Sequence, residues 1–146
     1  MNASLWATGI DADKEVARKQ KRRLHYIANV LIISNPAKPE LEGSVMAYKF
    51  GKKIFEKLTD TANPTFPDDP AINPFDPING ANFKLRMRQV EGYPNYDKSE
   101  FSEAKAISDS EDAILDVLNQ IKPLKDYVSP DKFKSYDELK TNLDSV

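Results

Sequence analysis

The sequence predicts an α+β protein, because segments with strand patterns come first along the chain and segments with helix patterns follow. Its 146 residues suit a single domain, spanning residues 1–146. Apolar residues make up 40% of the chain and charged residues 30%, which is typical of a globular protein and not of a disordered one. The longest apolar stretch, 27–33, is interrupted by Asn29 and is far shorter than the roughly 18 residues of a membrane helix, so we expect no membrane partner.

The N-terminal third of the chain predicts an arm, a basic segment and a β-hairpin. Residues 1–13 carry little pattern and are expected to form a loop-like arm. Residues 14–23 are basic, either helical or extended, and lead into a strand over 24–34 that is rich in Val and Ile. A second strand over 44–48 follows the loop SNPAKPELEG, whose prolines favour a turn, so the two strands are expected to pair.

The next segments predict a short helix and a long loop. Phe50, Ile54 and Leu58 recur at the spacing of one helix face, which indicates an amphipathic helix over 51–59. Residues 62–80 contain five of the ten prolines, and proline both fixes φ and lacks an amide donor. This stretch is therefore expected to be a Pro-rich loop without regular structure.

Residues 82–90 show a period of two, which predicts one strand. Its two faces are Phe83, Leu85 and Met87 on one side and Lys84, Arg86 and Arg88 on the other, so that one face is wholly basic. An aromatic turn over 93–96 follows Gly92, and the region 101–146 is then expected to be helical.

Two helices are expected within the region 101–146. Ser110 is placed to cap a helix that runs near 110–121 and that Pro123 stops. Ser135 and Glu138 match a capping box at the start of the last helix.

Charge is unevenly distributed although the net charge is only -2. Residues 14–57 hold 11 basic and 4 acidic side chains, whereas residues 101–146 hold 6 basic and 10 acidic ones. The first region therefore favours a polyanionic partner, and the second favours a different one.

Features of catalytic and metal sites are scarce in this sequence. It has no cysteine, a single histidine at position 25, and neither a Gly-rich phosphate loop nor a G-x-S-x-G elbow. His25 is more simply explained by a structural or surface role. We therefore expect no enzyme, no metal site and no cofactor.

Basic residues interleaved with tyrosines are the stronger signal. Single-stranded nucleic acid is bound by cations along its phosphates and by aromatic rings on which unpaired bases stack. The candidate nucleic-acid-binding residues are Lys21, Arg22, Arg23, Tyr26, Tyr48, Lys49, Lys52, Lys53, Arg86, Arg88, Tyr93 and Tyr96. Each also has a plain interpretation, since basic runs form solvated surfaces and strand tyrosines often belong to a core or an edge.

Two alternatives stay open on the residues alone. RNA would use the same cations and rings as DNA, because no motif here reports a contact to the sugar hydroxyl. The acidic helices after Ser110 could instead make the chain a protein-protein interaction module that recruits replication partners.

Three stretches of the sequence resemble, in order and spacing, the T4-type bacteriophage single-stranded DNA-binding proteins. They are RRLHYIANVLIISNPAKPELEGSVMAYKFGKKIF, NGANFKLRMRQVEGYPNYDKSEF and SPDKFKSYDELKTNL. The likeness covers roughly residues 14 to 144. It implies a helix-destabilising protein of phage DNA replication, recombination and repair, acting in the cytoplasm of an infected bacterial host. It also implies an OB-fold core, a small β-barrel that lays single strands over its face. By matching positions, Tyr26, Tyr48, Tyr93 and Tyr96 are similar to the family's cleft aromatics, and Arg22 and Arg23 to its basic residues.

The chain departs from that family pattern in three respects. The family carries a basic N-terminal arm, a Cys/His zinc module and an acidic C-terminal tail, and none of these is expected within residues 1–146. The sequence is therefore interpreted as a core-domain fragment with an incomplete barrel. An exposed sheet edge would then favour a homodimer. Single-stranded DNA and phage replication proteins are the other expected partners.

Overall fold

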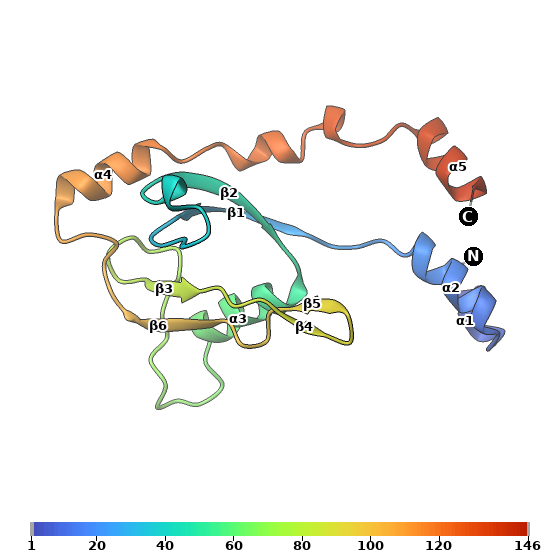
Figure 1. Ribbon diagram of the computed structural model, residues 1–146, viewed down its shortest axis with the longest axis horizontal. Coiled ribbons are helices and arrows are strands. Elements are labelled where there is room, and N and C mark those ends of the chain that lie inside the picture. The colour runs from blue at the N-terminus through green and yellow to red at the C-terminus, as the bar shows by residue number, and fades with distance from the viewer. Residues whose placement is uncertain (1, 146) are drawn as a thin grey trace. The chain divides into compact units, whose positions relative to one another are not determined.

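The computed structural model describes residues 2–145, which divide into two compact units (Figure 1). One unit, the terminal unit, contains the chain up to Leu24 and from Lys125 onward, and the central unit is His25–Leu124. Helices and small antiparallel sheets are both present, which confirms the predicted α+β class. The single domain predicted for residues 1–146 stays a prediction.

The terminal unit begins with two helices, α1 (Asn2–Ala7) and α2 (Asp11–Gln20). The loop predicted over residues 1–13 is therefore wrong. Acidic residues in the first turn of α2 and basic residues in its last turn suit the helix dipole, and the Arg18 guanidinium lies 5.6 Å from the ring centroid of Trp6. This cation–π contact ties α1 to α2, a long-range effect that sequence periodicity does not report. Of the two forms predicted for residues 14–23, the helical one is found up to Gln20.

The C-terminal part of the terminal unit is a short 3-10 turn, η3 (Pro130–Lys132), followed by α5 (Tyr136–Asp144). The predicted capping box is confirmed, because the Glu138 amide donates to the Ser135 hydroxyl and the Ser135 amide donates to the Glu138 carboxylate. A further 3-10 turn, η2 (Leu124–Tyr127), joins the two units along the chain.

The central unit starts with the predicted hairpin, which the structure confirms. β1 (Tyr26–Leu31) pairs antiparallel with β2 (Val45–Phe50), with Tyr26 opposite Phe50 and Leu31 opposite Val45. The connecting loop contains η1 (Pro39–Leu41). Figure 1 shows the two strands as a long curved ribbon that leads into α3 (Lys52–Ala62). That helix confirms the one predicted over 51–59 and continues beyond it.

The core of the central unit lies between this hairpin and α3. Its buried residues are Ala28, Phe50 and Ile54, and half-buried apolar side chains surround them: Tyr26, Tyr48, Phe55, Leu58, Phe83 and Tyr96. The core is small, so each of its side chains matters for stability. Residues 62–80 contain no helix or strand beyond the end of α3 at Ala62, which confirms the predicted Pro-rich loop.

The single strand predicted over 82–90 is wrong. The structure has β3 (Ala81–Lys84) and β4 (Arg88–Val90), separated by three residues outside any strand, and both Leu85 and Met87 are exposed. The interruption has a structural cause in a residue further along the chain, because the Ser99 hydroxyl accepts from the Arg86 amide (2.9 Å) and donates to the Arg86 carbonyl (3.1 Å). These two bonds replace the strand ladder at Arg86.

Two further strands complete the sheets. β5 (Tyr93–Asn95) pairs with β4, and β6 (Glu100–Ala104) pairs with β3. The region predicted as helical from 101 onward therefore starts with a strand, since β6 is stabilised by a partner some twenty residues away. α4 (Glu111–Asn119) follows with the predicted Ser110 cap, and the Asn29 side chain bonds both backbone groups of Lys122 just after it.

Across residues 2–145 the strands form three two-stranded sheets and no closed barrel. The barrel implied by the family resemblance therefore stays a prediction.

Candidate nucleic-acid interface

A row of stacked aromatic rings runs along the inner face of the β1–β2 hairpin. Tyr26 and Phe50 are opposite each other, as are Ala28 and Tyr48, so these side chains share one face of the sheet. The ring centroids of Tyr48 and Phe50 are 5.8 Å apart, and those of Phe50 and Tyr26 are also 5.8 Å apart. Phe55 from α3 stacks on Tyr26 at 3.9 Å and 4°. We call these four residues the ring row.

The ring row gives its two tyrosines different surroundings. Tyr26 is stacked against two phenylalanines, so its ring is committed to internal packing. Tyr48 is stacked against Phe50 alone among the ring pairs of residues 2–145. Burial raises the pKa of the Tyr48 phenol above its usual 10.0, and the neighbouring Tyr96 raises that pKa further. Tyr26, Tyr48 and Tyr96 all pack against the one core, so three of the four predicted tyrosines converge.

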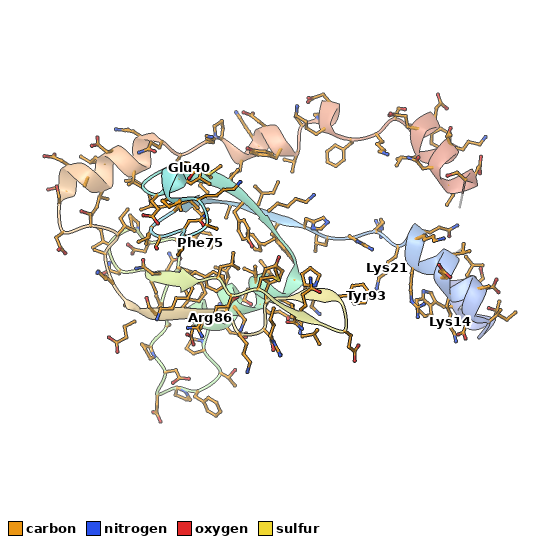
Figure 2. All side chains as sticks on the ribbon, viewed as in Figure 1. Lys14, Lys21, Glu40, Phe75, Arg86 and Tyr93 are labelled. Atoms are coloured by element: carbon orange, nitrogen blue, oxygen red, sulfur yellow. The ribbon has the colours of Figure 1, made fainter. Side chains whose placement is uncertain are left out.

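Tyr93 differs from those three because its side chain is 76% exposed. It follows the two-residue turn Glu91-Gly92 of the β4–β5 hairpin, in which both residues have positive φ, 51° and 80°. Positive φ at both turn residues matches the right-handed twist of a tight hairpin. Figure 2 shows Tyr93 at this end of the hairpin.

The lysines near the ring row lie at the start of α3 and on the outer side of β2. Lys49 neighbours Tyr48 in β2 and therefore points to the opposite face of the sheet. Lys52 and Lys53 occupy the first turn of α3, where the amide groups are already positive and no acidic residue or side-chain cap is present. Lys52 forms an ion pair with Glu56 at 3.3 Å, whereas Lys49 and Lys53 have no ion pair within residues 2–145. An anion at this helix start would relieve the charge repulsion.

The two predicted arginines of the 82–90 segment both have carboxylate partners. Arg86 contacts Glu100 at 3.0 Å, in a half-exposed pair (Figure 2 labels Arg86). Arg88 forms a bidentate ion pair with Asp97: its Nε donates to Oδ1 at 2.8 Å, and a terminal guanidinium nitrogen donates to Oδ2. The guanidinium holds the pKa of Asp97 at about 2, and the carboxylate raises that of Arg88. The wholly basic face predicted for this segment is therefore wrong, because these two acidic residues offset its charge.

Lys21, Arg22 and Arg23 belong to the terminal unit, where they follow the end of α2 without regular structure. All three side chains are exposed, and none has an ion pair within the described part of the chain. They form a stretch of free positive charge within the terminal unit.

Sequence reasoning missed Phe55, which supports Tyr26, and the trio Asp97, Ser99 and Glu100, which orders the two arginines. The apolar spacing of Phe55 with Leu58, next to Ile54 in α3, is the signal that could have found it. For the trio no local signal exists, because strands β5 and β6 themselves were not predicted.

Among residues 2–145 no three His, Cys, Asp or Glu side chains come together in a way that suits a metal ion. Within the same residues, no helix has both the length and the apolar character needed to cross a membrane.

Free cations, an exposed tyrosine and half-buried tyrosines on a small α+β framework are features typical of nucleic-acid-binding proteins. The family described as "gp32 DNA binding protein like" matches residues 1–146, and the chain belongs to that family. It is 40% identical over 133 residues to the single-stranded DNA-binding proteins of Enterobacteria phage T2 and Enterobacteria phage T4. These alignments cover 86% of this chain and 43% of each relative, so the chain spans less than half the length of these relatives. The family resemblance found in the sequence is confirmed.

Proposed function

We propose that this chain binds single-stranded DNA with little sequence preference, through phosphate neutralisation and base stacking, and that it catalyses no reaction. The observation that carries the proposal is the exposed ring of Tyr93 together with the half-buried Tyr48, in a protein with free lysines and arginines. Membership of a DNA-binding family supports the same partner.

The twelve predicted residues take different roles in this proposal. Tyr48 and Tyr93 offer ring surface for bases, while Tyr26 and Tyr96 support that surface from the core. Lysines at the start of α3 hold phosphate, aided by the positive end of the helix. Four further cations contribute positive charge, Lys21, Arg22, Arg23 and Lys49, as does Arg86 once it leaves Glu100. Arg88 stays paired with Asp97.

The biological consequence proposed is the trapping of melted DNA. A ligand that binds only unpaired strands shifts the equilibrium of the duplex toward melting by mass action. Because the relatives are phage proteins, we place this activity in DNA replication, recombination and repair in the cytoplasm of an infected bacterium.

Titration of the protein's fluorescence with a short oligo-dT tests the proposal. The double variant Tyr48→Ala/Tyr93→Ala should bind much more weakly, since each stacked base contributes about 1–3 kcal/mol. Tyr136→Ala is the matched control, because Tyr136 is 78% exposed but lies on α5, outside the candidate interface. Unchanged affinity in a folded double variant would refute the stacking role, and competition by oligo-U would show whether RNA is preferred.

A protein-interaction role is the second candidate, and exposed apolar residues beyond Leu124 favour it. Val128, Phe133, Tyr136 and Leu139 are all exposed, and the wider region 101–146 holds 10 acidic against 6 basic side chains. Such patches often dock partners, and phage replication proteins are the partners proposed. Pull-down of a replication protein that survives nuclease treatment, without any binding to oligo-dT, would favour this role over the first.

Two architectural proposals accompany these roles. The open edges of the two-stranded sheets support pairing of two copies into a homodimer, which light scattering at micromolar concentration would reveal as a doubled mass. The curved β1–β2 hairpin supports an OB-type barrel in this family, and an experimental structure would test that.

A further inference from the structure

The end of the hairpin that lies away from its turn is held together by residues outside the two strands, Ser99 and Asp97. At its base the buried Ser99, 1% exposed, bonds both backbone groups of Arg86, and the Ser99 amide donates to the Tyr96 carbonyl (3.0 Å). Further along, the Arg88 guanidinium holds Asp97 with two parallel bonds. The Asp97 amide in turn donates to the Asn95 side chain (2.9 Å).

The Arg88–Asp97 pair is on the same side of the hairpin as Tyr93. Val90 is opposite Tyr93 and Arg88 is opposite Asn95, and directly opposed side chains in an antiparallel pair project from the same face. Residues two apart in a strand also share a face. Arg88 and Tyr93 are therefore diagonal neighbours, with Asp97 fixing the arginine.

A two-stranded hairpin of this size needs such support. β4 and β5 contain three residues each, and an isolated hairpin is marginally stable in water. No ring of residues 2–145 stacks on Tyr93, in contrast to Tyr26 and Tyr48. Its direction is consequently set by the hairpin backbone and by the side chains on the hairpin face.

We infer that Asp97 is a positioning residue for DNA binding: through its two-pronged bond to Arg88 it fixes the hairpin that presents Tyr93 to a base. Arg88 has the same role and is not a phosphate contact. The inference rests on the proposed binding of single-stranded DNA and deepens it, since it assigns an acidic residue to a surface that binds a polyanion.

Simple electrostatics gives the opposite expectation, which makes the inference testable. Removing a negative charge near bound DNA should strengthen binding, and removing a positive charge should weaken it. A positioning role instead means that Asp97→Asn and Arg88→Gln both weaken binding, although they change the net charge in opposite directions. Glu100→Gln is the matched control, because Glu100 also pairs with an arginine but by one contact and outside the hairpin.

The experiment is oligo-dT titration of the full chain at two salt concentrations, combined with a cycle in which Asp97→Asn is made with and without Tyr93→Ala. We expect Tyr93→Ala to cost about 5- to 150-fold in affinity, the range of one stacked base. Asp97→Asn and Arg88→Gln should each weaken binding at least about threefold without changing the salt dependence, whereas Glu100→Gln should bind equally or more tightly. In the Tyr93→Ala background, Asp97→Asn should have almost no further effect.

The outcomes separate this inference from the function on which it rests. Wild-type protein that does not bind oligo-dT would overturn the proposed function itself. If Tyr93→Ala weakens binding but Asp97→Asn strengthens it or leaves it unchanged, only the positioning role is overturned. Equal weakening by Asp97→Asn in both backgrounds also overturns it, because the effect would not pass through Tyr93. If circular dichroism shows that Asp97→Asn is unfolded, Arg88→Gln decides the question in the same cycle.

Discussion

Two adjacent lysines at the start of α3 should differ in how they contribute to the salt dependence of DNA binding. Lys52 and Lys53 are one residue apart, but Lys52 is paired with Glu56 and Lys53 has no ion pair within residues 2–145. When a paired cation moves from its carboxylate to a phosphate, the phosphate releases a counterion but the freed carboxylate takes one up. Its net release of counterions is therefore small, while a free cation contributes in full.

The slope of affinity against salt follows from counting such cations. Of the eight predicted, Lys52, Arg86 and Arg88 have carboxylate partners, which leaves the five free ones Lys21, Arg22, Arg23, Lys49 and Lys53. At about -0.7 per phosphate on a single strand, five contacts give a logarithmic slope of about -3.5, or about 130-fold weaker binding between 50 and 200 mM salt. Eight contacts would give about -5.6 and about 2,000-fold.

Oligo-dT titrations of wild type, Lys52→Gln and Lys53→Gln over this salt range measure these slopes. Lys53→Gln should make the slope shallower by about 0.7, and Lys52→Gln should leave it nearly unchanged. Equal changes in the two variants would refute the pairing argument, and a wild-type slope near zero would refute phosphate neutralisation altogether.

Three further predictions concern stability. Ile54→Ala should lower the free energy of unfolding by about 2–5 kcal/mol in urea titrations, because Ile54 is 4% exposed at the centre of a small core; a loss below about 1 kcal/mol would contradict this. Since burial raises the pKa of Tyr48 above 10.0, the stability linked to its neutral phenol is complete below pH 10 and is lost as pH rises through the folded-state value. Tyr48→Phe should reduce this alkaline loss, and an identical alkaline profile would show that the linkage is wrong. Arg88 lowers the pKa of Asp97 from 3.8 to about 2, so the stabilisation of the hairpin by this ion pair is present above pH 3.8 and is lost as pH falls through about 2. Amide hydrogen exchange at Tyr93 should speed up over this acid range in wild type but not in Arg88→Gln.

The sequence predicted those parts of the fold that depend on local pattern. The β1–β2 hairpin, α3 and the capped starts of α4 and α5 were all visible as apolar spacing, turn residues or capping residues. The parts that were missed depend on partners far along the chain. α1 is held to α2 by the contact of Arg18 with Trp6, and β6 exists because β3 pairs with it.

The same difference between local pattern and distant partners explains which parts of the candidate site could be predicted from the sequence. Residue type and spacing were enough to select the tyrosines, and three of them do converge on one core. Spacing could not show that Phe55 stacks on Tyr26, nor that Asp97 and Glu100 neutralise the two arginines. These interactions join side chains from different elements, so the alternation of Lys84, Arg86 and Arg88 gave the appearance of an unopposed basic face.

The paired arginines also affect how single strands would be distinguished from duplex DNA under the proposed function. Attraction between free cations and phosphates is sequence-independent and, if anything, favours the duplex, whose charge density is higher. Stacking on a tyrosine requires an unpaired base and therefore favours the single strand. Ion pairs at Arg86 and Arg88 reduce the first contribution, while the hairpin that the Arg88–Asp97 pair helps to order presents Tyr93 for the second. The carboxylates that pair with these arginines would thus weaken the electrostatic attraction to phosphates and make binding more selective for melted DNA.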